Sequence, residues 1–228
     1  MNLKAVLFDL HDTLAYLESP VNSEEVSDFL LKHGYRVYPQ SWDAASHYVG
    51  MVDYPKHGYG DREAFLKQIL RRLDAEVDDD TLKKLAELYD CRNNYSLFPD
   101  AAPAVRKAKQ LGLKTAIVTT IPDFVFSSAI EPIRDCFDTV MTGRRALCEK
   151  SNPSMHQKTL EELKTLPKQA VMIGDEVLVD IRIPKKLGMH TILLERSNEF
   201  KKKPSEADMK AKTLTEAMTI IEKWKTKK

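Results

Sequence analysis

The stretch VLFDLHDTLAYL, residues 6–17, places a short apolar strand directly before a carboxylate. The apolar run ends at Asp9, and the polar residues His, Asp and Thr follow at positions 11–13. In an open parallel sheet, ligands bind at the carboxyl ends of the strands, so a carboxylate at this place can take part in chemistry. Other parallel strands of the chain could bring further polar residues to Asp9 at their carboxyl ends.

The composition is that of a protein that folds around its own core. Of the 228 residues, 43% are hydrophobic, which is enough for one large domain or two small ones. The 35 Lys and Arg residues nearly balance the 34 Asp and Glu residues, so we expect neither nucleic acid nor an anionic membrane as a partner. Two short lysine clusters, at 201–203 and 225–228, are interpreted as solvated surface.

The cysteines and the N-terminal segment indicate a cytoplasmic protein. The three cysteines form no C-x-x-C pair and are odd in number, which argues against a zinc site and against a disulfide framework. The first residues lack the apolar region of a signal peptide, and no apolar run approaches the ~18 residues of a membrane helix. We expect a protein of the reducing cytoplasm, present as a monomer or a homodimer.

Apolar and β-branched residues run together in five segments. These predicted strands are Lys4–Phe8, Lys114–Thr119, Thr139–Thr142, Ala170–Ile173 and His190–Leu194. Helix-period segments separate the later strands, at Ala102–Leu111, Asp123–Glu131 and Ser154–Leu166. Such alternation predicts right-handed β-α-β crossovers and a parallel sheet covered on both faces. The predicted fold class is α/β, with a Rossmann-like sheet core.

The segment between the first two strands shows helical periodicity and no strand pattern. Its predicted helices run from a capping box at Asn22 to Gly34, and over Gln40–Met51, Arg62–Leu73 and Asp80–Asn93. A polar and aromatic loop, VDYPKHGYGD at 52–61, separates the second helix from the third. We predict a helical domain at 16–96, inserted into a core domain formed by 1–15 and 97–228.

Polar residues stand at or after the ends of the predicted strands. They are Asp9, Thr119, Thr120, Lys150 in the loop after the third strand, and Asp175. Asp9 and Asp175, with Asp180 nearby, repel one another unless a cation lies between them, and oxygen ligands suit Mg²⁺. Lys150 and the hydroxyl of Thr119 can hold a group with several anionic oxygens, such as a phosphoryl group. A rigid carboxylate beside a metal can attack phosphorus, which makes Asp9 the predicted nucleophile.

The sequence resembles the haloacid dehalogenase superfamily of hydrolases in four motifs that occur in the family's order. The motifs are FDLHDTL at 8–14, AIVTT at 116–120, EKSNP at 149–153 and VMIGDEVLVDI at 171–181. LFPDAAPAVRKAKQLGLK, before the second motif, and KKLGMHTILL, after the fourth, are also similar to the family. The resemblance covers about residues 4–195. It implies a Rossmann-like core with a helical cap, and a Mg²⁺-dependent phosphatase of a small phosphorylated metabolite.

Carried over position by position, the resemblance implies a role for each of these residues. The implied magnesium ligands are Asp9, the backbone carbonyl of His11 and Asp175, and Asp180 would support the metal site from behind these ligands or through water. Asp9 would also be the nucleophile that forms an aspartyl-phosphate. Thr119 would bond a phosphoryl oxygen, and Lys150 would offset charge between the nucleophile and the phosphate.

The chain departs from the family pattern at His11. Phosphatases of the family carry Asp at this position, where it protonates the leaving oxygen and later deprotonates the attacking water. Histidine can perform both steps, because its ordinary pKa of about 6.5 suits general acid–base catalysis.

Three functions therefore stay open. They are a phosphatase that uses His11 as its acid–base group, a 2-haloacid dehalogenase whose halide needs no proton, and a non-catalytic phosphate-binding relative. The Gly-Asp pair at 174–175 and Asp180 favour the metal-using phosphatase over the dehalogenase.

The predicted loop at 52–61 contains two candidates for contact with the substrate. Lys56 and His57 could close over a bound substrate, as cap loops do, or could belong to a solvated loop. Thr120 stands where Asn or Gly is common in the family, and we expect it to contact the substrate or the cap.

Overall fold

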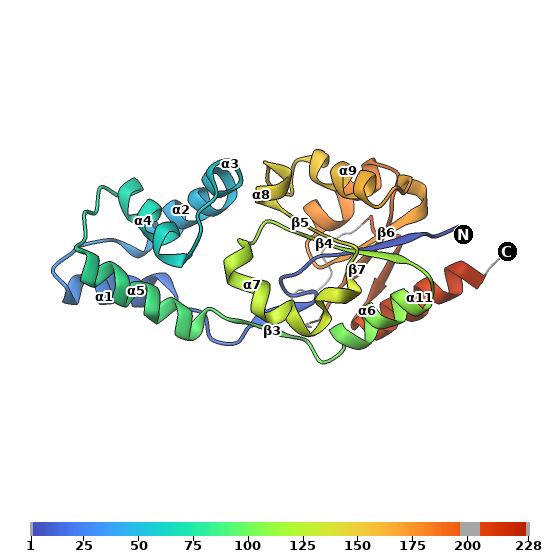
Figure 1. The fold of residues 1–228 in the computed structure, drawn as a ribbon, viewed down its shortest axis with the longest axis horizontal. Helices are drawn as coiled ribbons and strands as arrows, with labels where there is room; N and C mark the ends of the chain where they lie inside the picture. The colour runs from blue at the N-terminus through green and yellow to red at the C-terminus, as the bar shows by residue number, and fades with distance from the viewer. Residues whose placement is uncertain (1, 197–205, 227–228) are drawn as a thin grey trace.

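The computed structural model describes residues 2–196 and 206–226, and it shows an α/β core beside a group of helices (Figure 1). The core is a six-stranded parallel sheet in the order β5-β4-β1-β6-β7-β8. The strands are β1 (Ala5–Phe8), β4 (Lys114–Thr119), β5 (Thr139–Thr142), β6 (Ala170–Gly174), β7 (His190–Leu194) and β8 (Met209–Ala211). The predicted Rossmann-like fold class is confirmed. The lysine cluster at 201–203 lies outside the described residues.

The central strands supply side chains to both faces of the sheet. In β1, Val6 and Phe8 belong to one hydrophobic cluster, and Ala5 and Leu7 belong to another. Helices cover both clusters (Figure 1): α6 (Ala101–Gln110), α7 (Asp123–Ile130) and α11 (Leu214–Thr226) on the first, and α9 (Pro153–Glu162) on the second. All four residues of β1 are fully buried. A strand that is buried on both faces has apolar residues at successive positions. The continuous apolar runs in the sequence therefore predicted the central strands correctly.

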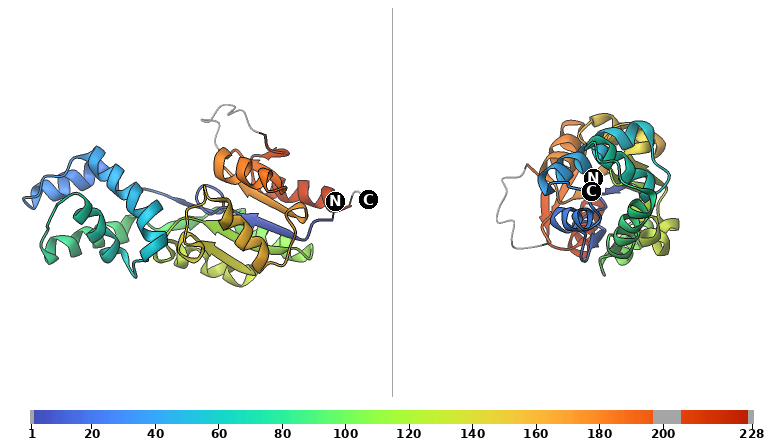
Figure 2. Two further views of the ribbon diagram at one scale, coloured as in Figure 1. Left: turned by 90° about the horizontal axis from the view of Figure 1, so that it is seen from above. Right: turned by 90° about the vertical axis from the view of Figure 1, so that its left-hand side faces the viewer.

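The residues between β2 (Ala15–Leu17) and β3 (Tyr95–Leu97) form a helical module with its own hydrophobic cluster. Its helical segments are α1 (Ser23–Lys32), α2 (Pro39–Tyr48), the π-helix η1 (Val49–Asp53), α3 (Tyr54–His57), α4 (Arg62–Arg72) and α5 (Asp79–Arg92). The module lies at one end of the molecule, toward the carboxyl ends of the strands (Figures 1 and 2). Among the described residues, no helix is both long and apolar enough to cross a membrane.

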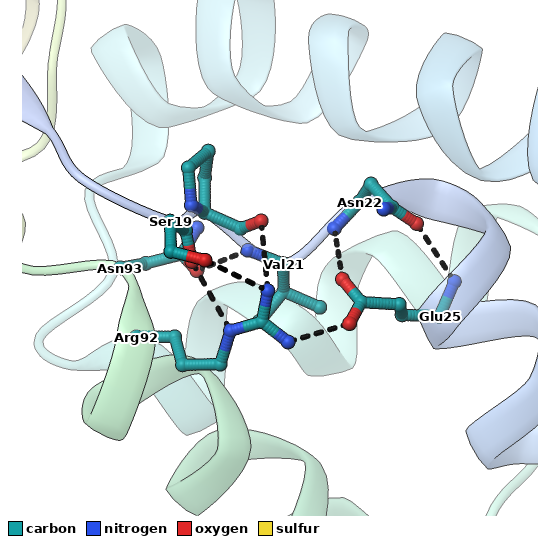
Figure 3. A network of polar contacts seen from close by, with 7 residues as sticks. Ser19, Val21, Asn22, Glu25, Arg92 and Asn93 are labelled. Atoms are coloured by element: carbon teal, nitrogen blue, oxygen red, sulfur yellow. Dashed lines mark hydrogen bonds and ion pairs between the residues drawn. The ribbon is translucent and has the colours of Figure 1, made fainter.

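Strands β2 and β3 pair antiparallel, so the chain enters and leaves the helical module at one place. Beyond β2, Arg92 at the end of α5 donates hydrogen bonds to the backbone oxygen of Ser19 (3.1 Å) and to Oε1 of Glu25 (2.6 Å). Oδ1 of Asn93 accepts from the backbone nitrogen of Val21 at 2.9 Å. Figure 3 shows this network, in which Glu25 also completes the capping box of α1. The network holds together the segment that joins β2 to α1 and the segment that joins α5 to β3.

Helix α3 of the module packs against α8 (Gly143–Ala146), the short core helix that follows β5. Nη1 of Arg144 donates to the backbone oxygen of Lys56 at 2.6 Å. The hydroxyl of Tyr54 accepts from the backbone nitrogen of Asp123 at 3.3 Å. These two bonds join the helical module to the core at a second place, in addition to the β2–β3 ribbon.

The structure corrects two of the predicted elements. Residues 52–57, predicted as part of a loop, are helical, because η1 continues α2 and α3 follows directly. Pro55 lies near the start of α3, directly after the π-helical segment η1. The helix predicted over Ser154–Leu166 ends at Glu162, because Lys164 adopts a left-handed conformation with φ 48°. Strands β2, β3 and β8 were not predicted.

Candidate active site

Three carboxylates meet at the carboxyl edge of the sheet. Asp9 follows β1 and Asp175 follows β6, and these two strands are neighbours in the register Phe8↔Ile173. Asp180 lies in the π-helix η4 (Val177–Arg182), which follows β6. One oxygen of each carboxylate lies within 4.8 Å of the others. The structure therefore brings together the three acidic residues that the sequence indicated.

Lys150 reaches these carboxylates from the segment that follows α8. Its Nζ lies 2.6 Å from Oδ1 of Asp180 and also forms an ion pair with Oδ1 of Asp9. The lysine is 5% exposed, and burial works against its charged form. The charges of Asp180 and Asp9 outweigh that effect and raise the pKa of Lys150 above its usual value. Lys150 therefore remains a fixed positive charge within the site.

Asp180 has partners on both of its oxygens. Oδ1 faces Lys150, and Oδ2 accepts a hydrogen bond from the backbone nitrogen of Glu176 at 3.0 Å. The carboxylate is 1% exposed, and burial raises its pKa although Lys150 opposes the rise. Asp180 thus holds Lys150 in place, and it offers less to an incoming ligand than Asp9 or Asp175 does.

Asp175 lies where negative charges accumulate. Its Oδ1 accepts from the hydroxyl of Thr13 at 3.3 Å. Burial, together with the charges of Asp9 and Asp12, raises the pKa of Asp175 to about 6. A carboxylate that its neighbours destabilise in this way is stabilised by a cation, and carboxylate oxygens are the donors that Mg²⁺ prefers. The residues present therefore fit Mg²⁺. Thr13 belongs to the first motif but was not among the predicted site residues.

His11 lies at the rim of this cluster, with its side chain 48% exposed. Its Nδ1 lies 3.0 Å from the hydroxyl oxygen of Tyr95, and its Nε2 lies 3.4 Å from Oδ2 of Asp12. Tyr95 was not predicted to belong to the site. It is 84 positions away in the chain, and a pattern that describes local sequence cannot indicate such a contact.

Thr119 and Thr120 stand at the end of β4, next to β1 in the sheet. Thr119 is 2% exposed, and its Oγ1 accepts from the backbone nitrogen of Ile121 at 3.2 Å. The hydroxyl hydrogen of Thr119 is left to donate. Thr120 lies beside Gly143 of α8. Within the described residues, no hydrogen bond connects either threonine to the three carboxylates.

Lys56 and His57 are not brought to the carboxylates. Both side chains are exposed at the end of α3, and in the described part of the chain neither contacts Asp9, Asp175 or Asp180. The contact that Lys56 makes with the core uses its backbone oxygen, which accepts from Arg144. A role for these two side chains in substrate binding remains a prediction.

Comparisons with known proteins agree with this arrangement. The model of the haloacid dehalogenase-like hydrolase family matches residues 3–188. The haloacid dehalogenase-like hydrolase domain-containing protein 3 of Xenopus laevis is 29% identical over 213 residues, covering 85% of this chain and 85% of that protein. A glyceraldehyde 3-phosphate phosphatase of Pyrococcus furiosus is 27% identical over 200 residues, covering 83% of this chain and 80% of that protein. The crystal structure of a 2-haloacid dehalogenase from Pseudomonas syringae superposes with a TM-score of 0.70 at 18% identity, over 97% of this chain and 99% of that one. At that identity the likeness shows the fold alone.

Proposed function

This chain belongs to the haloacid dehalogenase-like hydrolases, and from that membership and its site we propose that it is a Mg²⁺-dependent phosphatase of a small phosphorylated metabolite. The observation that carries the proposal is the gathering of Asp9, Asp175 and Asp180 around the buried charge of Lys150. A cation site beside a fixed lysine suits a substrate group with several anionic oxygens. A relative named as a glyceraldehyde 3-phosphate phosphatase supports this substrate class.

The proposed magnesium ligands are Asp9, Asp175 and the backbone carbonyl of His11. Lys150 occupies Oδ1 of Asp9, which leaves Oδ2 of that carboxylate for other partners. Asp180 supports the site through Lys150 or through water, because both of its oxygens already have partners. When bound, the ion supplies positive charge against the phosphoryl oxygens.

The reaction proposed for these residues has two displacements at phosphorus. A carboxylate oxygen of Asp9 attacks, the bond from phosphorus to the leaving oxygen breaks, and that oxygen takes a proton from His11. Water then attacks the aspartyl-phosphate while His11 accepts its proton, and phosphate leaves with Asp9 restored. Thr119 donates a hydrogen bond to a phosphoryl oxygen, and Lys150 offsets the charge between Asp9 and the phosphate.

In this proposal, residues 16–96 form a cap domain, and residues 1–15 with 97–228 form the catalytic core. The hydrophobic cluster within the helical module and the pairing of β2 with β3 support this division. Thr120, Lys56 and His57 are proposed to contact the part of the substrate that lies beyond the phosphoryl group. The docking of α3 on α8 supports this placement of the two α3 residues.

A dehalogenase is the second candidate function, and the observation that favours it is His11 in place of an acidic residue. Asp9 would then displace a halide, which leaves without a proton. The cluster of three carboxylates argues for the phosphatase, because displacement of a halide needs no metal. Mg²⁺ dependence separates the two enzymes, and turnover separates both from a protein that only binds phosphate.

The proposal is tested by phosphate release from an aryl phosphate and a panel of small metabolite phosphates, with Mg²⁺ and with a chelator. We expect Mg²⁺-dependent release by the wild-type protein and none by Asp9→Asn. If only His11→Asp releases phosphate, the pocket supports hydrolysis. The wild-type protein then either only binds phosphate or acts on a substrate whose leaving group needs no proton. Halide release from a 2-haloacid without metal would support the dehalogenase. If neither the wild type nor His11→Asp releases phosphate, hydrolysis of phosphate esters is contradicted.

A further inference from the structure

Tyr95 makes two contacts with the His11 ring. Its hydroxyl oxygen lies 3.0 Å from Nδ1, and the two rings meet edge to face with their centroids 5.6 Å apart and their planes at 89°. The imidazole is therefore held both by a hydrogen bond and by an aromatic contact. Nε2 is not engaged by the tyrosine, and its neighbour is Oδ2 of Asp12 at 3.4 Å.

Tyr95 is itself fixed by the fold. It is 8% exposed, belongs to the hydrophobic cluster of the core, and lies on β3 opposite Leu17 of β2. A phenol has an ordinary pKa of about 10, so the hydroxyl of Tyr95 keeps its proton near neutral pH. The half-exposed His11 ring is thus anchored to a rigid neutral group.

A phenol hydroxyl can accept a hydrogen bond from Nδ1–H in both steps that the proposed reaction asks of His11. When both ring nitrogens carry protons, Nδ1–H donates to Tyr95 and Nε2–H remains to protonate a leaving oxygen. After that transfer, Nδ1 keeps its proton and its bond to Tyr95. The lone pair then lies on Nε2, where it can take a proton from water.

We propose that Tyr95 is a positioning residue, whose hydroxyl holds Nδ1 of His11 and so makes Nε2 the nitrogen that exchanges protons with substrate and water. This inference rests on the proposed phosphatase function, with His11 as its acid–base group. It assigns to β3, a strand of the linker to the helical module, a direct effect on proton transfer in the core.

The test compares Tyr95→Phe, which removes only the hydroxyl, with Tyr16→Phe on the paired strand β2. The hydroxyl of Tyr16 reaches Oε1 of Glu18 at 3.5 Å and has no part in the site. An alkyl phosphate, whose leaving oxygen needs a proton, is compared with an aryl phosphate, whose leaving oxygen needs little protonation. We expect Tyr95→Phe to lower kcat/KM, which reports the steps up to departure of the leaving group, about tenfold on the alkyl phosphate and less than about twofold on the aryl phosphate. In a His11→Ala protein the same substitution should have no effect on kcat/KM.

A second readout needs no activity. In the metal-free protein, the side-chain ¹⁵N signal of Nδ1 of His11, identified as the one absent from His11→Ala, should shift in Tyr95→Phe and stay in place in Tyr16→Phe. An unshifted signal overturns the inference, as does an equal loss of kcat/KM on both phosphates. A wild-type protein that releases no phosphate overturns the proposed function, and the NMR comparison alone then decides whether Tyr95 holds His11.

Discussion

Gly174 leaves the space that the carboxylate of Asp180 occupies: a Cβ at residue 174 would overlap the side chain of Asp180. Gly174 is the last residue of β6, and Asp180 lies six residues further on, where η4 turns back over the strand end. The glycine of the fourth motif is therefore required by a side chain and not by its own backbone conformation. The absence of a side chain at Gly174 leaves room for Asp180 to reach Lys150.

Gly174→Ala should lower both stability and activity. The added methyl group displaces the carboxylate of Asp180, and overpacking of a buried site costs about 1–3 kcal/mol in the free energy of unfolding. Gly60→Ala is the matched control, because a Cβ there meets nothing within 4 Å. Urea unfolding and phosphate release measure both effects. Equal stability of the two variants would contradict the steric role of Gly174.

Lys150→Met should destabilise the protein by about 3 kcal/mol, because loss of one partner leaves buried charges uncompensated. The double variant Lys150→Met/Asp180→Asn should recover part of that loss, since one of the two unpaired carboxylates is then neutral. Urea unfolding at neutral pH measures the change, and the exposed Lys168→Met serves as the control. A double variant less stable than Lys150→Met would show that the charge pair is not the cause.

Asp175 should contribute a loss of stability to the metal-free protein as the pH rises from about 4 to about 6. Asp175 has its pKa raised from 3.8 to about 6, so the folded protein holds this proton more tightly than the unfolded chain does. The resulting stability is fully present below the lower pKa and is lost as the pH rises through the higher one. The difference between the two pKa values corresponds to about 3 kcal/mol.

Asp175→Asn should remove this part of the pH dependence. Urea unfolding in the presence of chelator, at several pH values, compares the stability of the two proteins. Burial raises the pKa of Asp180 in both of them, so the difference between their stability curves reports on Asp175. Added Mg²⁺ should stabilise the wild type more at pH 8 than at pH 5 and should not stabilise Asp175→Asn. Parallel stability curves for the two proteins would contradict the assignment to Asp175.

Arg144→Ala should loosen the contact between α3 and the core. The guanidinium donates to the backbone oxygens of Pro55 and Lys56 at the end of α3, so its loss removes two bonds across the boundary. We expect faster hydrogen–deuterium exchange in residues 54–58 and a KM raised about threefold or more, with a smaller change in kcat. Arg106→Ala, at an exposed position of α6, is the control. Unchanged exchange in α3 would show that other contacts hold it.

The sheet could be predicted from the sequence because its central strands are buried on both faces. Three of the five predicted strands have the predicted bounds, and the other two differ by one residue at one end. Strand β8 could not be found this way, because two of its three residues are exposed and it carries no apolar run. Strands β2 and β3 are three residues each and pair across 80 positions, which no local pattern records.

The carboxylates and Lys150 could be predicted because the ends of neighbouring parallel strands meet. The packing around them could not. Tyr95 reaches His11 from a strand that was not expected, and the helical turn that contains Pro55 has the composition of a loop. These features depend on where the helical module returns to the core, which is a property of the tertiary structure.

The ribbon of β2 and β3 holds the two ends of residues 18–94 at one place on the core. Because the chain departs from the core at Leu17 and returns at Tyr95, directly opposite, no strand of the six-stranded sheet lies within residues 18–94. In the proposed function, the helices of this module govern which molecules reach the site, while Asp9, Lys150 and Asp175 all come from segments outside residues 18–94. Changes in the helical module and changes in the residues of the site can therefore be inherited separately within one chain.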